Sequence, residues 1–421
     1  MPNIERSTQT AARPDLATLI DMEATLFVAL ELSLSSWVVV ASLPGEDKAS
    51  KHGVTACDGP GLLALLRRLR ERAERSLRRP VGVVVMQEAG RDGFWVHRLL
   101  EAHAVKSFVV DPSSIAVNRR SRRAKTDRID AEAMLRTLMA WARGERQVCA
   151  MVRPPSREAE DARRLGRERE TLLAERIRHA NRIKGLLATQ GVFGFEPILR
   201  NRRKRLAELR TSEGAALPPR LAAEIGRQVD RLELAMQQLA AVEDARDAAF
   251  AAERVADPAS GEAAHVAAND EAASVKAAPL PEREGAGARL LRLRGIGPET
   301  ASVLAGEAFF RDFRNRREVA SYAGLAPSPW QSGGVDHEQG ISKAGNSRVR
   351  KAMGQLAWLW LRNQPNSALS AWYRDRVRDG KGHVKRIAIV ALARKLLVAL
   401  WRFVTQGLVP TGAVLKPTKA G

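Results

Sequence analysis

VGVVVMQE, residues 81–88, is a short apolar run that ends on an acidic residue. Comparable runs occur on either side of it: LFVALELS from residue 26, WVVVAS from residue 37, a segment near VTACD at 54–58, and KSFVVD from residue 106. Helical patterns, GLLALLRRLRERAERSL and FWVHRLLEAHA, separate the later runs. Three early strands in succession, followed by strands separated by helices, predict a mixed α/β sheet.

The composition predicts a polyanionic partner. The chain has 421 residues, which favours two or three domains, and 45% of them are hydrophobic, so it can bury real cores. Lys and Arg outnumber Asp and Glu by 69 to 48, giving a formal charge of +21. Such a balance is typical of nucleic-acid-binding proteins. The alternative is a high-GC genome in which Arg replaces Lys on solvated faces, but clusters such as VNRRSRRAK at 117–125 argue against it.

Cysteine content and hydropathy predict a cytoplasmic protein. Two cysteines, Cys57 and Cys149, are too few for a disulfide framework or a zinc site. No N-terminal segment has the pattern of a secretion signal. The apolar stretch from Ile387 is interrupted by Arg394 and Lys395, which favours a packed amphipathic helix over a membrane span.

The rest of the chain is predominantly helical in pattern. Apolar residues recur at helical spacing through roughly 157–250, and a turn near LPPR (217–220) predicts an antiparallel coiled-coil hairpin, which serves as a spacer or an oligomerisation arm. Residues 254–286 are rich in Ala, Gly and Pro and predict a linker. LRLRGIGPETASVLAGE (291–307) has the pattern of a helix-hairpin-helix, whose turn amides can contact a phosphate backbone. A plain helical hairpin fits that segment equally well.

AKTDRIDAE (124–132) places Asp127 and Asp130 one turn apart on one face of a predicted helix. They could simply stabilise the helix dipole, with Asp130 pairing Arg128 or Lys125. Together with Glu31 in the first strand run and Glu88 at the end of a later strand, they could instead form the metal site of an RNase H-like domain, with Mg²⁺ or Mn²⁺ as the ion. Four clustered acids need compensating cations. The neighbouring basic run could supply them and also hold a phosphate backbone: Arg119, Arg120, Arg122, Arg123 and Lys125.

Longer motifs make the interpretation more specific. EAGRDGFWVHRLL, VVDPSSIAVNRRSRRAKTDRIDAEAM, LRGIGPETASVLAGE, ASYAGLAPSPWQSGG and GISKAGNSRVRKAM resemble the DEDD transposases of the insertion sequence one-ten family. The resemblance implies an RNase H-like (RuvC-like) domain over 24–145, a coiled-coil hairpin over 155–253, a linker over 254–286 and a mainly α-helical transposase domain over 287–408. It also implies a bacterial, nucleoid-associated recombinase guided by a non-coding bridge RNA that pairs with donor and target DNA. The coiled coil would make a homo-oligomer, a dimer or a tetramer.

The resemblance assigns roles to particular residues. The family's acidic tetrad falls on Glu31, Glu88, Asp127 and Asp130, although the first position is usually aspartate. The longer side chain of Glu31 adds a methylene and can shift the metal geometry. Ser332, in PWQSGG, would be the nucleophile that forms a phosphoserine link to DNA. Judged on its neighbours alone, Ser332 is better interpreted as a turn serine in a flexible loop.

The segment after Ser332 supplies further candidates. Lys343, Arg348 and Arg350 could stabilise developing phosphate charge. Four aromatic residues nearby suggest base stacking but are better interpreted mostly as core: Trp358, Trp360, Trp372 and Tyr373.

Two other functions remain open from the sequence. The chain could be an RNase H-like or junction-resolving nuclease, in which water attacks at the acidic site and Ser332 is structural. It could also be an inactive RNA-binding remnant of a mobile element, an alternative that the substituted Glu31 supports.

Overall fold

A computed structural model of the chain describes residues 20–90, 93–115, 127–255, 285–332, 335–378, 380 and 382–416. The chain divides into two units, Met1–Pro154 and Pro155–Gly421, and each unit is described by itself. The predicted linker at 254–286 lies mostly outside the described residues. On either side of it, α7 ends at Val255 and α8 begins at Ala286.

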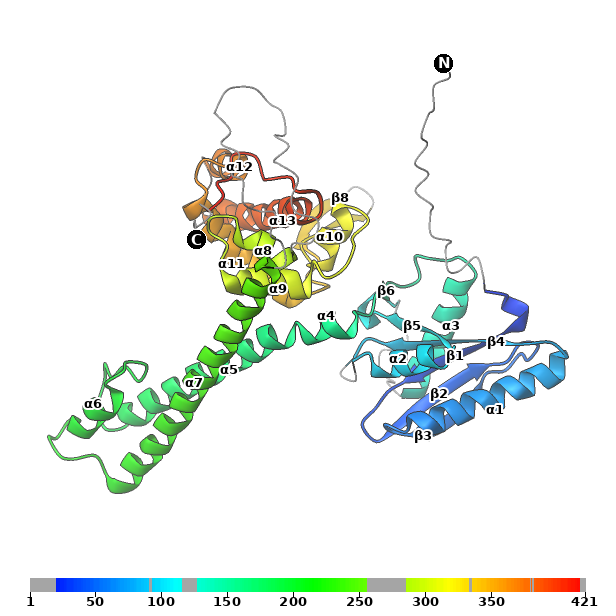
Figure 1. Cartoon of the computed structure of the whole chain (residues 1–421), viewed down its shortest axis with the longest axis horizontal. Coiled ribbons are helices and arrows are strands. Elements are labelled where there is room, and N and C mark those ends of the chain that lie inside the picture. Colours follow the sequence, from blue (N-terminus) through cyan, green and yellow to red (C-terminus); the bar gives the residue numbers. More distant parts are fainter. Residues whose placement is uncertain are drawn as a thin grey trace, which may run out of the picture. The chain divides into compact units, whose positions relative to one another are not determined.

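A six-stranded sheet forms the centre of the first unit (Figure 1). Its strand order is β3-β2-β1-β4-β5-β6. The strands are β1 (Thr25–Glu31), β2 (Ser36–Ser42), β3 (Ser50–Thr55), β4 (Gly82–Glu88), β5 (Lys106–Val110) and β6 (Met151–Val152). β1, β4 and β5 are parallel, and the outer pairings are antiparallel. The predicted mixed α/β sheet is therefore confirmed.

Helices cover both faces of this sheet. One face of β1, carrying Leu26 and Val28, packs in a core with α1 (Gly59–Leu77) and α2 (Trp95–Ala102). The other face, carrying Phe27 and Ala29, packs against α3 (Asp127–Ala142). Successive side chains of a strand point to opposite faces, so this alternation divides one buried strand between two cores. Short 3₁₀ turns, Met22–Ala24 and Pro112–Ser114, flank β1 and β5.

The second unit begins with an arm of helices. These are α4 (Arg157–Asp161), α5 (Arg164–Ala188), α6 (Arg202–Glu208) and α7 (Pro219–Val255). Arg169 pairs with Glu243 and Arg182 with Glu224, so α5 and α7 run antiparallel. The described structure thus has the two long helices that the sequence predicts, while their being a coiled coil stays a prediction.

The connection between α5 and α7 differs from the predicted turn near LPPR. α5 ends at Ala188, and residues 189–218 contain α6 and an isolated bridge between Arg210 and Ala216. The two prolines of LPPR mark only the start of α7, where a missing amide donor costs nothing, because the first helical amides have no partner within the helix.

The remaining elements of the second unit surround a helical core. They are α8 (Ala286–Leu291), α9 (Pro298–Glu307), α10 (Arg316–Tyr322), β7 (Pro327–Ser332), β8 (Val335–Ile341), α11 (Ser347–Asn363), α12 (Ala368–Val377) and α13 (Gly382–Gln406). The predicted helix from Ile387 is confirmed as part of α13, whose Leu396 and Phe403 are fully buried against the other helices. Within the described residues, no helix combines the length and apolar character that a membrane crossing needs.

The burial of the aromatic residues shows which of them pack in this core and which could stack on a base. Trp360 is fully buried, and its Nε1 donates a hydrogen bond to Ser367 Oγ at 2.9 Å. Tyr373 is buried as well, whereas Trp358 is 53% exposed. Core packing is therefore confirmed for Trp360 and Tyr373, and Trp358 is the aromatic residue of α11 that is open to a ligand.

Candidate active-site residues

Glu31 and Glu88 end two adjacent parallel strands. Glu31 is the last residue of β1, and Glu88 is the last residue of β4. The parallel register pairs Leu30 with Gln87, the residues immediately before them. Carboxyl ends of parallel strands meet at one edge of a sheet, so the two carboxylates start from neighbouring backbone positions.

Both acids lie on the face of the sheet that α3 covers. Side chains alternate along a strand, so Glu31 shares the face of Phe27, and Glu88 shares that of Met86. Phe27 and Met86 belong to the core that contains the buried residues of α3. Glu31 and Glu88 are half-buried, as expected at the rim of that core.

The predicted helical pair of aspartates belongs to α3. Asp127 is the first residue of α3, which the sequence predicts. Asp130 is half-buried and lies four residues before Met134, which is fully buried against the sheet. Residues four apart share a helix face, so Asp130 lies on the packed face of α3. The basic run from Arg119 to Lys125 lies outside the described residues.

The donor chemistry of these residues suits a hard divalent cation. Mg²⁺ prefers carboxylate oxygens, and the described structure places two carboxylates on adjacent strands and a third on the covering helix. Within the described side chains, however, no three His, Cys, Asp or Glu residues gather closely enough to hold a metal ion. The full tetrad therefore stays a prediction.

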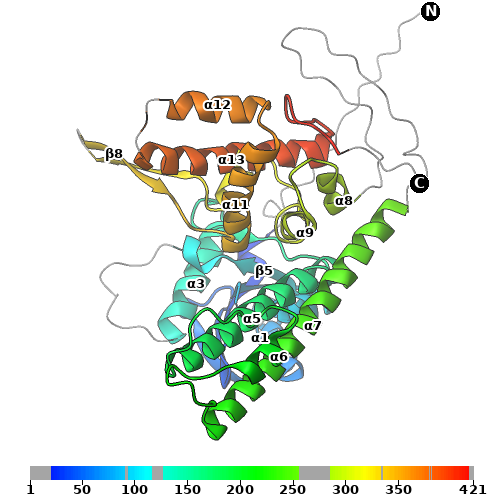
Figure 2. The same cartoon turned by 90° about the vertical axis from the view of Figure 1, so that its left-hand side faces the viewer.

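Ser332 lies in a strand, which corrects its predicted place in a flexible loop. It is the last residue of β7 and pairs with Val335 of β8. Only residues 333 and 334, which lie outside the described ones, separate the two strands. Figure 2 shows the hairpin extending away from the helices of its unit.

At the end of the hairpin away from Ser332, residues 322–326 lie against residues 342–346, and we call this end the hairpin root. It joins two of the quoted motifs, ASYAGLAP and GISKAGN. Three backbone hydrogen bonds connect them: Ser342 N–H to Ala326 O at 2.9 Å, Lys343 N–H to Gly324 O at 3.2 Å, and Asn346 N–H to Tyr322 O at 2.7 Å. The hairpin is therefore anchored at the end opposite Ser332.

Two glycines permit the close backbone approach at the root. Gly324 has φ +64° and Gly345 has φ +101°, in the region that side-chain-bearing residues avoid. A Cβ on Gly345 would lie 2.4 Å from Tyr322 O, and one on Gly324 would lie 2.2 Å from Ala344 O. Each glycine is thus required by both its conformation and its neighbour.

The three predicted phosphate-binding cations have different surroundings. Arg350 donates through Nη1 to Lys343 O at 2.8 Å and to Ala323 O at 3.3 Å, so its guanidinium group stabilises the root. Arg348 donates to Glu170 of α5 at 2.8 Å. Lys343 is exposed and has φ +57°. Their contacts with nucleic acid stay predictions.

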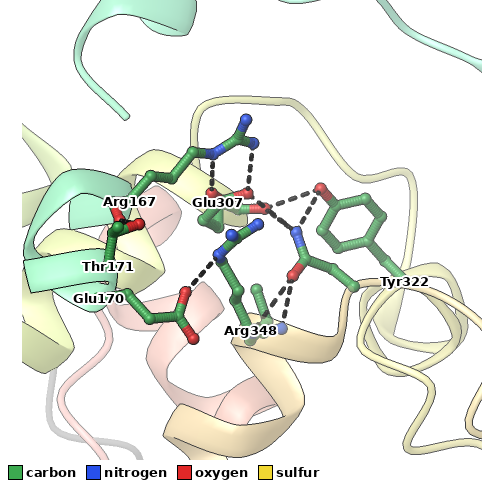
Figure 3. A network of polar contacts seen from close by, with 8 residues as sticks. Arg167, Glu170, Thr171, Glu307, Tyr322 and Arg348 are labelled. Carbon is green, nitrogen blue, oxygen red and sulfur yellow. Dashed lines mark hydrogen bonds and ion pairs between the residues drawn. The ribbon is translucent and has the colours of Figure 1, made fainter. Parts of the chain in front are cut away.

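A buried polar network around Glu307 is the feature that sequence reasoning missed (Figure 3). Glu307 ends α9 and is 5% exposed. Arg167 of α5 donates to its two carboxylate oxygens at 2.8 and 3.3 Å, and Asn346 Nδ2 donates to Oε2 at 3.1 Å. Burial alone would raise the pKa of this carboxyl group, but the hydrogen bonds from Arg167 and Asn346 outweigh it and hold the pKa below the ordinary 4.5.

The sheet order and the acids at its edge are consistent with the DEDD, RNase H-like class of nucleic-acid enzymes. A family profile described as "Transposase", of the DEDD type of IS110 elements, matches residues 34–190. A second, described as "Transposase IS116/IS110/IS902 family", matches residues 287–373.

Two relatives match most of the chain. A Sinorhizobium fredii protein named as a transposase, y4rJ, is 52% identical over 407 residues, which is 96% of this chain and 98% of the relative. The transposase for insertion sequence element IS1328 of Yersinia enterocolitica is 25% identical over 339 residues, or 78% of this chain and 86% of the relative. The chain belongs to the IS110 family of insertion-sequence transposases, and its activity is that of a DNA transposase.

Proposed function

We propose that this transposase cleaves and rejoins DNA with Ser332 as its nucleophile and with Glu31, Glu88, Asp127 and Asp130 as the holders of a divalent cation, Mg²⁺ or Mn²⁺. The observation that carries the proposal is the pair of carboxylates at the ends of adjacent parallel strands, on the face that α3 covers. The anchored hairpin that ends at Ser332 supports the second half of it.

The chemistry follows from the hydroxyl group of Ser332. Its Oγ attacks the phosphorus, a phosphoserine ester forms, and the bond from phosphorus to a sugar oxygen breaks. Attack by a sugar hydroxyl on the phosphoserine then rejoins the strand, so no external energy source is required. A bound divalent cation would stabilise the negative charge that develops at the phosphorus.

We further propose that the protein recognises donor and target DNA through a non-coding bridge RNA. The formal charge of +21 supports a polyanionic partner. We also propose that α5 and α7 mediate a homo-oligomer, a dimer or a tetramer, because a long antiparallel helix pair can extend its apolar seam to a second copy.

Trapping the covalent link tests the serine mechanism. End-labelled DNA, purified protein and its RNA are incubated in Mg²⁺ and separated by denaturing electrophoresis with and without protease. Wild type should give a protease-sensitive adduct, and Ser332→Ala should give neither adduct nor cleavage. Ser342→Ala, at an exposed serine near the other end of the hairpin, is the matched control and should cleave normally. If Ser332→Ala still nicks DNA at the wild-type position, the serine mechanism is refuted and the protein acts as a metal nuclease that uses water.

The acidic site is tested by Asp130→Asn, which removes charge at nearly constant volume. Cleavage should be lost while RNA binding is kept. Glu145→Gln, at an exposed carboxylate of the same unit, should cleave normally. Glu31→Asp, which restores the usual family residue, should keep or raise activity. Wild-type cleavage by Asp130→Asn would refute the metal assignment.

The basic run is tested through salt. Nucleic-acid affinity should fall with salt at a log-log slope of about 0.7–0.9 per phosphate contact. Alanine at Arg119, Arg120, Arg122 and Arg123 should flatten that slope. An unchanged slope would show that the run does not contact phosphate.

A further inference from the structure

We infer that Glu307 is a positioning residue for the hairpin that ends at Ser332, because it links the arm helix α5 to the root of that hairpin. The inference rests on the proposed serine mechanism. Glu307 is one of the few charged residues that are fully buried in the described structure, and its contacts reach α5, α10 and the start of α11.

The carboxylate of Glu307 is held from two directions. Arg167 approaches from α5 with two nitrogens, and Asn346 approaches from the hairpin side with Nδ2. A two-pronged pair of guanidinium and carboxylate fixes orientation as well as distance. Figure 3 shows Arg167 and Tyr322 on opposite sides of Glu307. Glu307 is therefore the group through which α5 and the hairpin root share a fixed geometry.

Asn346 transmits that geometry to the backbone. Its side-chain Oδ1 accepts hydrogen bonds from the amides of Arg348 and Val349 at 3.0 and 3.2 Å, which caps α11. Its own amide donates to Tyr322 O at 2.7 Å, which closes the hairpin root. One residue thus caps a helix, closes the root and contacts Glu307, so a rotation of its side chain disturbs all three.

Tyr322 completes the link. Its Oη donates to Glu307 O at 2.7 Å, and its ring packs edge-on against Phe313 with centroids 5.5 Å apart. Both the main chain and the side chain of Glu307 therefore contact residues that form the hairpin root. A second connection runs parallel to this one, since Arg348 donates to Glu170 of α5.

The physical consequence concerns the far end of the hairpin. A nucleophile displaced by about 1 Å from its productive position can lose roughly 100-fold in rate without losing substrate affinity. If Glu307 is replaced, Arg167 loses its carboxylate and Asn346 loses one acceptor, so the root is free to reorient. Because the root lies away from Ser332, the change should act on the rate of attack and not on DNA binding.

The experiment compares Glu307→Gln with Glu299→Gln. Both remove a carboxylate from α9, but Glu299 is 53% exposed in its side chain and pairs with Arg169, away from the hairpin root. With saturating DNA and RNA, single-turnover adduct formation should fall roughly 10- to 100-fold for Glu307→Gln and stay near wild type for Glu299→Gln. The dissociation constant for DNA should be unchanged in both.

Two further readouts separate positioning from simple loss of stability. Deuterium exchange of the amides of Ser342, Lys343 and Asn346 should be faster in Glu307→Gln, while exchange in α13 should stay slow. Tyr322→Phe, which deletes only the hydroxyl group, should give a smaller fall in adduct rate and serves if Glu307→Gln does not fold. Arg167→Lys combined with Glu307→Gln should be no slower than Glu307→Gln alone, because the two residues act through one contact.

Wild-type adduct rates in both Glu307→Gln and Tyr322→Phe would overturn the inference. Slower attack with unchanged amide exchange at the root would overturn it as well. Failure of the serine mechanism gives a different pattern, in which Ser332→Ala nicks DNA and no variant forms an adduct.

Discussion

Replacing Gly345 by alanine should destabilise the second unit more than replacing Gly340 by alanine. The two glycines lie five residues apart, and both have a positive φ, +101° and +85°. A Cβ on Gly340 would meet nothing within 4 Å, whereas one on Gly345 would meet Tyr322 O at 2.4 Å and Ser321 O at 2.9 Å. The pair therefore separates the cost of backbone conformation from the cost of a collision.

The expected magnitudes follow from these two terms. A residue with a Cβ in the left-handed region costs about 1–2 kcal/mol, and this applies to both variants. The collision at Gly345 is with backbone atoms, which cannot rotate away, and forced overpacking adds about 1–3 kcal/mol. Gly345→Ala should thus cost about 2–5 kcal/mol and Gly340→Ala about 1–2 kcal/mol.

Differential scanning calorimetry of the full chain measures the difference. At about 2–4 °C per kcal/mol, Gly340→Ala should lower the melting temperature of the second unit by about 2–8 °C, and Gly345→Ala by about 4–20 °C. Trp360→Phe identifies the transition, because Trp360 is fully buried in that unit. Equal shifts in the two glycine variants would refute the argument, since the backbone of the root would then accommodate a Cβ without strain.

Three further predictions concern cysteines, tryptophans and acid. A thiol reagent should modify exposed Cys57 rapidly and Cys149 only after unfolding, because burial raises the pKa of Cys149 to about 11; equal rates would contradict this. Trp360→Phe should lower thermal stability by about 2–4 kcal/mol through a lost hydrogen bond and a cavity, whereas Trp358→Phe should change it by less than about 1 kcal/mol. Because the pKa of Glu307 is lowered in the folded state, its ionised carboxylate stabilises the fold above pH 4.5, and this contribution is lost as the pH falls through the folded-state pKa. Glu307→Gln should therefore reduce the loss of stability on acidification, and an unchanged pH dependence of stability would refute this.

The sheet and its helices could be predicted because each depends on local periodicity. The run VGVVVMQE forms β4, and Asp127 opens α3 as its spacing indicates. The position of Glu88 at a strand end also followed from its run, whereas Glu31 was predicted only to lie within the first strand run and is in fact the last residue of β1. Local pattern therefore gave the elements and part of the acidic site.

The features that local pattern missed depend on pairing between distant segments. PSPWQS contains two prolines, which usually indicate a loop, yet it forms β7 because β8 pairs with it and the ladder is irregular between Pro327 and Pro329. The contact of Arg167 with Glu307 spans 140 residues, so no sequence window contains both. The connection over 189–218, which contains α6, was missed because the two prolines of LPPR were interpreted as the turn between the long helices.

The contacts of the network around Glu307 can form only late in synthesis, because they join residues far apart in the sequence. α5 emerges from the ribosome before its partners, since Arg167 precedes Glu307 by 140 residues and Glu170 precedes Arg348 by 178. At 5–20 residues per second, Arg167 remains without Glu307 for about 7–28 s. During that interval the nascent chain carries every acidic candidate but not Ser332. A ribosome that stops early thus leaves α5 without the residues that pair with Arg167 and Glu170.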